Sequence, residues 1–398
     1  MNVLYVCADR GIPLDGVKGA SIHVRQTVEG LLRRGHEVTM LAARPGHGWH
    51  LAAPVVVAET SPDGLRSAGT LASELDGLAH ARDLVRAVIT NDLRPDLVYE
   101  RYSLWSVAGA AIADALKIPL VLEVNAPLVD EQQRYRRLVL GGVAAEIERF
   151  LMPRADAVLC VSSELARRVR GLRGSSEGVL EFPNAVDTER FFPLPPGPSN
   201  GTGPIVVFVG TLKPWHGLPL LVRAFARMRE QHSAARLRLI GTGPERERLE
   251  ALAEETGVSG SLEFLGAVEH ERVPQLLQQA DIAVAPYPPL ENFYFSPLKV
   301  GEYLAAGLPV VASRCGDLTD LLVDGETALL VPPGDVPALA GALSQLGHDA
   351  SLRRNLGQAG RRLALERMSL DSAMTRLSGL LTKLVADASP RKQVKETS

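Results

Sequence analysis

The chain has 398 residues, a formal net charge of −3 and 46% hydrophobic residues. This length allows two domains with separate cores, since single cores usually stop growing near 250–300 residues. The nearly balanced charge argues against a dedicated nucleic-acid binder, which normally has a strongly basic face. No uncharged apolar run approaches the roughly 18–20 residues that cross a bilayer, and the first residues do not resemble a signal peptide. We therefore expect a soluble, cytoplasmic protein whose membrane contact is at most peripheral.

The three cysteines are far apart in the sequence and lack the spacing of metal ligands. They are Cys7, Cys160 and Cys315, and the first two fall in predicted strands. This pattern predicts buried free thiols in a reducing compartment.

The N-terminal half alternates short apolar runs with helical patterns, which is typical of a parallel α/β sheet. Strands are predicted at residues 3–7, 38–42, 97–99, 119–124, 157–161 and 180–182. Helices are predicted at residues 21–34, 69–91, 105–116 and 144–152, whereas residues 44–67 have no clear assignment.

A segment of Pro, Gly, Ser, Thr and Asn at residues 193–204 predicts a linker, after which the pattern restarts. Strands are predicted at residues 205–209, 237–240, 262–265, 282–285 and 310–312. Helices are predicted at residues 217–231, 245–256, 273–279, 296–307, 337–346, 352–366 and 371–386, followed by a polar, disordered tail. Two doubly wound halves of this kind would place a ligand cleft between their facing strand ends.

The stretch SPLKVGEYLAAGLPVVAS, at residues 296–313, predicts a short helix followed by a buried strand. Ser296 is a good N-cap and Pro297 suits the first helical position. The helix start then leaves free backbone amides at Leu298 and Lys299, which together with the helix dipole form a site for an anion.

Two charged side chains extend this prediction. Lys299 opposes the helix dipole in the first turn, so its presence suggests that an anion offsets both. Glu302 lies three residues later on the same face, where a carboxylate could accept hydrogen bonds from sugar hydroxyls. Together they predict a nucleotide site, although an ordinary surface pair of Lys299 and Glu302 is an equally good reading of this stretch alone.

Several other enzyme classes do not fit. The dinucleotide fingerprint is absent after the first strand, and its only near match, at Gly241 and Gly243, ends on Arg246 in place of a small residue. The P-loop of kinases is also absent. Metal-dependent sugar transferases usually have two acids one residue apart after a strand, and this sequence has no Asp-x-Asp, so a divalent metal is not implied. We expect no other cofactor.

Six motifs follow one another in the order seen in a known family. They are FPNAVDTERFFP at 182–193, IGTGPERERLEALA at 240–253, FLGAV at 264–268, ADIAVAPY at 280–287, the stretch at 296–313, and DGETALLVPPGD at 324–335. This series resembles the retaining glycosyltransferases of family 4. The resemblance covers nearly the whole chain and is most specific between residues 182 and 335.

The resemblance implies an α/β fold of the GT-B type, in which two Rossmann-like doubly wound domains face each other across a cleft. The acceptor-side domain would be residues 1–195, joined by the C-terminal helix 370–387. The nucleotide-sugar domain would be residues 196–369, and residues 388–398 would form the disordered tail. The implied enzyme transfers a hexose from a UDP- or GDP-type sugar to a hydroxyl of a small-molecule or glycan acceptor, with retention.

The same resemblance implies roles for individual residues. Glu302 matches the second acid of a Glu-x7-Glu motif and would hold the ribose. The amides of Leu298 and Lys299, with Ser296 before them, would bind the diphosphate. Residues 264–268, which end at Val268, would lie where the base is held, and Gly19 would let backbone approach the donor phosphate from the other domain.

Four departures from the family pattern involve five positions. Tyr294 replaces the first acid of Glu-x7-Glu, Thr211 and His216 replace an Arg and a Lys, Asn125 replaces a His, and Lys18 precedes Gly19 where the family has paired glycines. Thr211 and Tyr294 therefore remain donor-binding candidates with altered chemistry.

The missing cations leave other residues to stabilise the leaving diphosphate. We expect Lys299 to be the main cation, assisted by Lys213 or His216, with Asn125 also in the catalytic set. The reaction would need no metal and would proceed by front-face substitution. A nucleotide-sugar 2-epimerase of the same architecture and a non-catalytic nucleotide-sugar-binding protein remain as alternatives.

Overall fold

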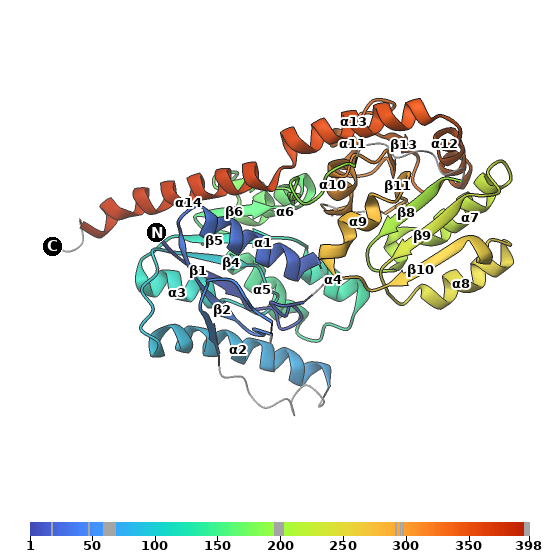
Figure 1. Cartoon of the computed structure of the whole chain (residues 1–398). Helices are drawn as coiled ribbons and strands as arrows, with labels where there is room; N and C mark the ends of the chain where they lie inside the picture. The colour runs from blue at the N-terminus through green and yellow to red at the C-terminus, as the bar shows by residue number, and fades with distance from the viewer. Residues whose placement is uncertain are drawn as a thin grey trace. The chain divides into compact units, whose positions relative to one another are not determined.

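The computed structural model describes residues 1–16, 19–46, 48–58, 69–194, 203–290, 293–294, 296 and 298–393, except for the side chains of 135 and 389–393 (Figure 1). The chain divides into two compact units. Unit 1 comprises Met1–Pro183 with Asp371–Ser398, and unit 2 comprises Asn184–Leu370. None of the helices in the described ranges has the length and apolar character that a bilayer span requires.

Unit 1 contains a parallel sheet of seven strands in the order β3-β2-β1-β4-β5-β6-β7. The strands are β1 (Asn2–Cys7), β2 (Glu37–Ala42), β3 (Val55–Val57), β4 (Leu97–Arg101), β5 (Leu120–Val124), β6 (Ala157–Cys160) and β7 (Val179–Glu181). All six strands predicted for this half are present. The additional strand, β3, lies in the segment without a clear assignment, where its three residues give too little pattern to recognise.

The helices of unit 1 are α1 (Gly19–Arg33), α2 (Thr70–Thr90), α3 (Ala108–Leu116), α4 (Leu128–Tyr135), α5 (Gly141–Leu151), α6 (Ser163–Arg173) and α14 (Leu370–Gln393). Helix α14 reaches unit 1 from the far end of the sequence and packs on α1, where Met374 lies against Gly30. The prediction of disorder from residue 388 is wrong as far as Gln393, where α14 ends. The remaining tail, 394–398, lies outside the described residues.

Unit 2 contains a parallel sheet of six strands in the order β10-β9-β8-β11-β12-β13. The strands are β8 (Ile205–Val209), β9 (Arg236–Ile240), β10 (Leu262–Gly266), β11 (Ile282–Ala285), β12 (Val310–Ser313) and β13 (Leu329–Val331). The helices are α7 (Leu218–Arg229), α8 (Arg246–Glu255), α9 (Val273–Leu277), α10 (Leu298–Ala305), α11 (Leu318–Leu321), α12 (Val336–His348) and α13 (Ala350–Arg367). Short 3-10 helices include η2 (Pro214–His216) and η4 (His270–Arg272).

Both faces of the second sheet are covered by apolar side chains. Val206 and Phe208 of β8 pack in one core cluster, whereas Val207 between them packs in another. Since successive strand residues point to opposite faces, the two clusters lie on opposite sides of the sheet. This two-sided burial explains why the inner strands β8 (IVVFV) and β11 (IAVA) are continuous apolar runs, whereas β9 and β10 also carry charged residues.

Unit 2 begins at Asn184, ahead of the domain boundary expected after residue 195. Val186 and Phe191 are buried in the core of unit 2. The backbone of Val186 also donates to Met368 O at 2.8 Å. Most of the linker segment, residues 195–202, lies outside the described residues.

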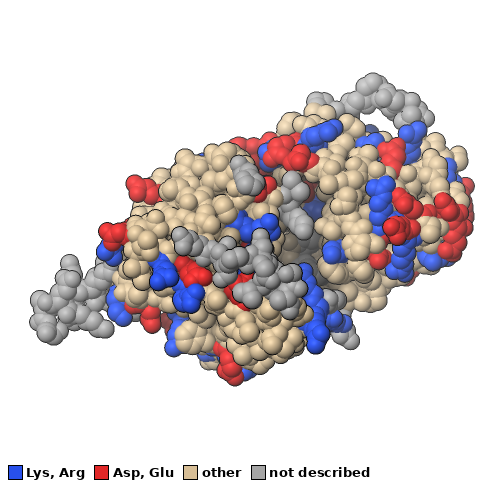
Figure 2. Space-filling view, turned by 90° about the horizontal axis from the view of Figure 1, so that it is seen from below, with Lys and Arg blue, Asp and Glu red and all other residues tan. Residues whose placement is uncertain are grey.

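In each sheet the strand order reverses direction once, between β1 and β4 and between β8 and β11. Open α/β sheets bind ligands at the carboxyl ends of the strands next to such a reversal. On the face shown in Figure 2, Lys and Arg lie among Asp and Glu, in line with the balanced charge of the sequence.

The cysteines show the state that the sequence predicts. All three are free, Cys7 and Cys160 are buried in strands, and Cys315 is partly buried. Burial raises the pKa of Cys7 and of Cys160 to about 12, so both thiols are unreactive at neutral pH.

Candidate functional site

Two glycines follow the central strands of unit 2 and bring their loops close to the start of α10. Gly210 follows β8 with φ +141°, and Gly241 follows β9 with φ +137°, a backbone region that favours glycine. A Cβ atom on Gly241 would lie 2.1 Å from the carbonyl oxygen of Gly210. A Cβ atom on Gly210 would lie 3.1 Å from Nζ of Lys299. The absence of side chains therefore lets the loop after β8 lie beside the Lys299 ammonium.

Lys299 is a buried cation in the first turn of α10. It is 9% exposed, and its Nζ lies 4.1 Å from the ring centroid of Phe208 and 5.7 Å from that of Tyr287. No described residue forms a hydrogen bond with Nζ. Burial lowers the pKa of Lys299 to about 7, although Glu302 acts in the opposite direction. Because an unpaired buried charge is costly, this site is suited to an anionic ligand.

Glu302 lies one turn further along α10 and is 8% exposed. Its Oε1 is 2.8 Å from Nε2 of His270, at the start of η4. The alternative of an ordinary surface pair of Lys299 and Glu302 is therefore wrong, because both side chains are buried and the described contacts pair Glu302 with His270.

The loop after β8 holds three of the predicted residues. Thr211 is exposed, and its carbonyl oxygen lies 2.6 Å from Nδ1 of His216. Burial, with the neighbouring Lys299 charge, lowers the pKa of His216 to about 3. The Nζ of Lys213 lies 5.4 Å from the ring centroid of Trp215. His216 is therefore uncharged at neutral pH in the unliganded protein, which leaves Lys213 and Lys299 as the groups that can carry positive charge in this region.

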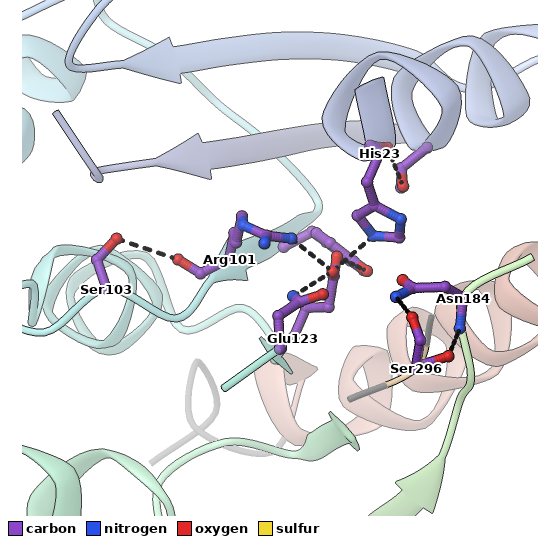
Figure 3. Close-up of polar contacts among 9 residues, drawn as sticks. His23, Arg101, Ser103, Glu123, Asn184 and Ser296 are labelled. Atoms are coloured by element: carbon purple, nitrogen blue, oxygen red, sulfur yellow. Dashed lines mark hydrogen bonds and ion pairs between the residues drawn. The ribbon is translucent and has the colours of Figure 1, made fainter. Parts of the chain in front are cut away.

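The segment before α10 is held by Asn184, which belongs to the motif at residues 182–193. The backbone nitrogen of Asn184 donates to Oγ of Ser296 at 3.0 Å, and its side-chain amide donates to the Ser296 carbonyl oxygen at 3.0 Å (Figure 3). Pro297 lies outside the described residues, and α10 begins at Leu298. The predicted N-cap of Ser296 and first-turn place of Pro297 stay predictions.

The remaining donor-binding candidates of unit 2 are Tyr294, Leu298 and Val268. Tyr294 is 8% exposed and lies in the segment between β11 and α10. Leu298 begins α10 and is half-buried, and Val268 is half-buried against the core. The three candidates therefore come from three segments of unit 2: the one before α10, the start of α10 and the one after β10.

Unit 1 has its own polar cluster at the carboxyl end of β5, centred on Glu123, which is 2% exposed (Figure 3). Its Oε1 lies 2.6 Å from His23 Nε2 and 3.1 Å from Arg101 Nη1, and Asn125 Nδ2 donates to it at 2.5 Å. The hydroxyl of Tyr99 donates to Oε2 at 2.6 Å. Burial alone would raise the pKa of Glu123, but the charges and hydrogen bonds of its neighbours hold it below the usual range.

This cluster sets the orientation of one predicted residue. Because the carboxylate of Glu123 only accepts, the amide nitrogen of Asn125 faces it. The amide oxygen, to which no described residue is seen to donate, can accept a hydrogen bond from a hydroxyl group. Gly19 is the first residue of α1 and is exposed, whereas Lys18 lies outside the described residues.

Sequence reasoning missed His23, Arg101, Glu123 and His270. Glu123 gave a usable signal, because it interrupts the otherwise apolar strand LVLEV. The other three come from segments that are distant in sequence from the groups they contact, so no local pattern indicates them.

Comparisons with known proteins agree on one family. The profile described as Glycosyl transferases group 1 matches residues 194–363, and that described as Glycosyltransferase Family 4 matches residues 17–190. The chain is 30% identical, over 298 residues, to the GDP-mannose-dependent alpha-(1-6)-phosphatidylinositol monomannoside mannosyltransferase of Mycolicibacterium smegmatis. This match covers 69% of the chain and 75% of that protein.

Two solved structures have the same fold. Sucrose-phosphate synthase from Thermosynechococcus elongatus superposes with a TM-score of 0.76 at 22% identity, covering 97% of this chain and 100% of that one. The Anabaena protein HepE in complex with UDP superposes with a TM-score of 0.72 at 20% identity, covering 96% of this chain and 100% of that one.

Proposed function

Because the chain belongs to the group 1 glycosyltransferases, GT-B enzymes that use nucleotide-sugar donors, we propose that it moves a sugar from a UDP- or GDP-type donor to an acceptor hydroxyl with retention at the anomeric carbon. The observation that carries this proposal is the buried ammonium of Lys299 at the start of α10, which has no hydrogen-bond partner among the described residues, with the buried carboxylate of Glu302 one turn later. The first group suits a diphosphate and the second suits a ribose.

The diphosphate would lie at the start of α10. Free backbone amides and the positive end of the helix dipole attract an anion there. The Lys299 ammonium adds a full charge in a site from which water is largely excluded, where electrostatic attraction is strong. Because His216 is uncharged, Lys299 would be the principal cation on the leaving phosphate, with Lys213 assisting.

The proposed transfer occurs on one face of the donor sugar. The bond from the anomeric carbon to the diphosphate oxygen breaks, and the acceptor oxygen forms the new glycosidic bond on the same face. The acceptor hydroxyl gives its proton to the departing phosphate oxygen, so no protein base is required. Lys299 and the α10 amides would stabilise the negative charge that develops on the diphosphate.

The comparisons support the two donor types in this proposal. The name of the Mycolicibacterium relative describes a GDP-mannose-dependent enzyme, and the Anabaena structure contains UDP. The acceptor would be a small molecule or glycan with a free hydroxyl. Without a pair of aspartates one residue apart, metal independence is part of the proposal.

The test is calorimetric binding of UDP and GDP to the wild type and to Glu302→Ala. Loss of a hydrogen bond to a charged group costs about 1.5–3 kcal/mol, so we expect the better ligand to bind roughly 10- to 100-fold more weakly to the variant. Glu254→Ala, at an exposed position on α8, is the matched control. Unchanged affinity in Glu302→Ala would refute the ribose assignment.

Activity assays distinguish the remaining readings. We expect diphosphate release that requires an acceptor, persists in EDTA and gives a retained anomeric product by NMR coupling. An isomerised nucleotide sugar formed without an acceptor would indicate an epimerase. A protein that binds the donor but releases no diphosphate, whichever of a panel of sugar and polyol acceptors is added, would be a binding protein.

A further inference from the structure

Among the residues that the structure describes, one side chain holds the buried carboxylate of Glu302. Nε2 of His270 lies 2.8 Å from Oε1, and both residues are 8% exposed. No hydrogen bond from a described residue reaches Oε2. A buried carboxylate normally needs hydrogen-bond donors on both oxygens. The second oxygen therefore remains available to a ligand.

The other ring nitrogen of His270 determines which nitrogen carries the proton. Nη1 of Arg190 lies 3.4 Å from Nδ1 of His270, and Nη2 of Arg190 lies 3.6 Å from Oε1 of Glu271. A guanidinium only donates hydrogen bonds, so Nδ1 must accept and the proton must lie on Nε2. Arg190 therefore donates a hydrogen bond to His270, and His270 donates one to Glu302.

Packing also fixes the orientation of the imidazole. The rings of Phe191 and His270 lie 5.5 Å apart between centroids at an interplanar angle of 50°. Arg190 and Phe191 both belong to the motif at residues 182–193, and the core of unit 2 buries Phe191. The motif thus supplies both the hydrogen-bond donor and the ring that hold His270.

We propose that His270 is a positioning residue that holds one oxygen of Glu302, so that the other is aimed at a ribose hydroxyl and selects ribonucleotides over deoxyribonucleotides. This inference rests on the proposed nucleotide site. In it, Arg190 acts through His270 by fixing the tautomer, and neither residue touches the donor. A site that recognises a hydroxyl in this way rejects the analogue lacking it, because its polar group is then left unpaired.

The test compares two amide variants that differ in reach. The amide nitrogen of His270→Gln can take the place of Nε2, whereas that of His270→Asn takes the place of Nδ1 and cannot reach Glu302. The readout is the affinity for the nucleoside diphosphate divided by that for its 2′-deoxy and 3′-deoxy forms, by calorimetry. We expect a ratio of roughly 10–100 for at least one deoxy form in the wild type, a similar ratio in His270→Gln, and about threefold or less in His270→Asn.

Other outcomes separate this inference from the proposed function. If His270→Asn keeps the wild-type ratio, or weakens all three ligands equally, His270 is merely structural and the inference is overturned. If Glu302→Ala also keeps the ratio, the nucleotide site itself is wrong. Should His270→Asn fail to fold, as judged by its melting temperature, Arg190→Met gives the same readout through the tautomer. A full wild-type ratio in that variant would also overturn the inference.

Discussion

The ammonium of Lys299 contacts aromatic rings and lacks a described hydrogen-bond partner, so replacing Lys299 by Met tests the charge with little change in packing. Removing a group aimed at transition-state charge typically lowers the rate by roughly 10²–10³. We expect Lys299→Met to reduce turnover by about this factor, and more than it weakens donor binding. Steady-state kinetics with saturating donor measures both effects.

Lys213→Met is the matched control for this substitution. Lys213 is more exposed than Lys299 and lies over Trp215, so we expect a smaller loss of turnover. A crippled Lys213→Met beside a nearly normal Lys299→Met would show that the loop after β8, and not α10, supplies the main charge.

Donor binding should also depend on pH through Lys299. In the free protein the pKa of Lys299 is lowered to about 7, and an anionic ligand favours the protonated form. Binding of a nucleotide sugar should therefore weaken as pH rises above about 7, by up to tenfold per pH unit. A nucleotide sugar is the correct probe, because its phosphates, unlike the terminal phosphate of a diphosphate, do not titrate in this range.

Two variants assign this pH dependence. It should disappear in Lys299→Met and persist in His216→Gln, since the lowered pKa of His216, about 3, keeps that ring uncharged throughout. Persistence in Lys299→Met together with loss in His216→Gln would assign the titration to the histidine.

At the scale of elements, Glu100 joins β4 to α3. It is 1% exposed, and its carboxylate accepts hydrogen bonds from Ser106 Oγ at 2.6 Å and Gly109 N at 3.0 Å. Burial raises its pKa from 4.5 to about 7, with both hydrogen bonds acting in the opposite direction. Between these two pH values the folded state keeps a proton that the unfolded state has lost, so stability falls as pH rises.

Glu100→Gln should remove this dependence while preserving the shape of the side chain. Relative to the variant, the free energy of unfolding of the wild type should fall by on the order of 2 kcal/mol between pH 4.5 and pH 8. Urea denaturation of both proteins at the two pH values measures the difference. If the free energies of unfolding of the two proteins differ by the same amount at both pH values, Glu100 is ionised in the folded protein and its charge is stabilised by its hydrogen bonds.

The predictability of the elements follows from how local their signals are. The central strands and α10 were predicted because continuous apolar runs and a Ser-Pro start identify them without tertiary information. Helix α4 was missed because it has only eight residues and no buried apolar stripe among them. The roles of His23 and Arg101 at Glu123 depend on register between strands and on the position of α1, which no local sequence pattern indicates.

At the scale of the whole molecule, each unit has a sheet with one reversal of strand order and charged side chains near it. The presence of two doubly wound sheets was predictable, because the sequence contains two successive patterns of alternating strands and helices. The unit boundary was not, since composition marks the Pro- and Gly-rich segment while packing of Val186 and Phe191 assigns the preceding residues to unit 2.

Because each unit has its own core, we expect the protein to unfold in two transitions that can be altered separately. A Cβ atom on Gly30 of α1 would lie 2.3 Å from Cγ of Met374 on α14, which is 3% exposed. Gly30→Ile should therefore overpack unit 1, at a cost of about 1–3 kcal/mol. That cost lowers one transition by roughly 2–4 °C per kcal/mol. The nucleoside diphosphate should raise only the other transition, that of unit 2.

Gly379→Ile provides the matched control on α14, because a Cβ atom at Gly379 would have no neighbour within 4 Å. Both variants place an isoleucine in a helix, so they share its effect on helix propensity, and only Gly30→Ile disturbs the contact between α1 and α14. Differential scanning calorimetry with and without the diphosphate resolves the transitions. If the ligand raised the transition that Gly30→Ile lowers, the two units would unfold together and nucleotide binding would stabilise both.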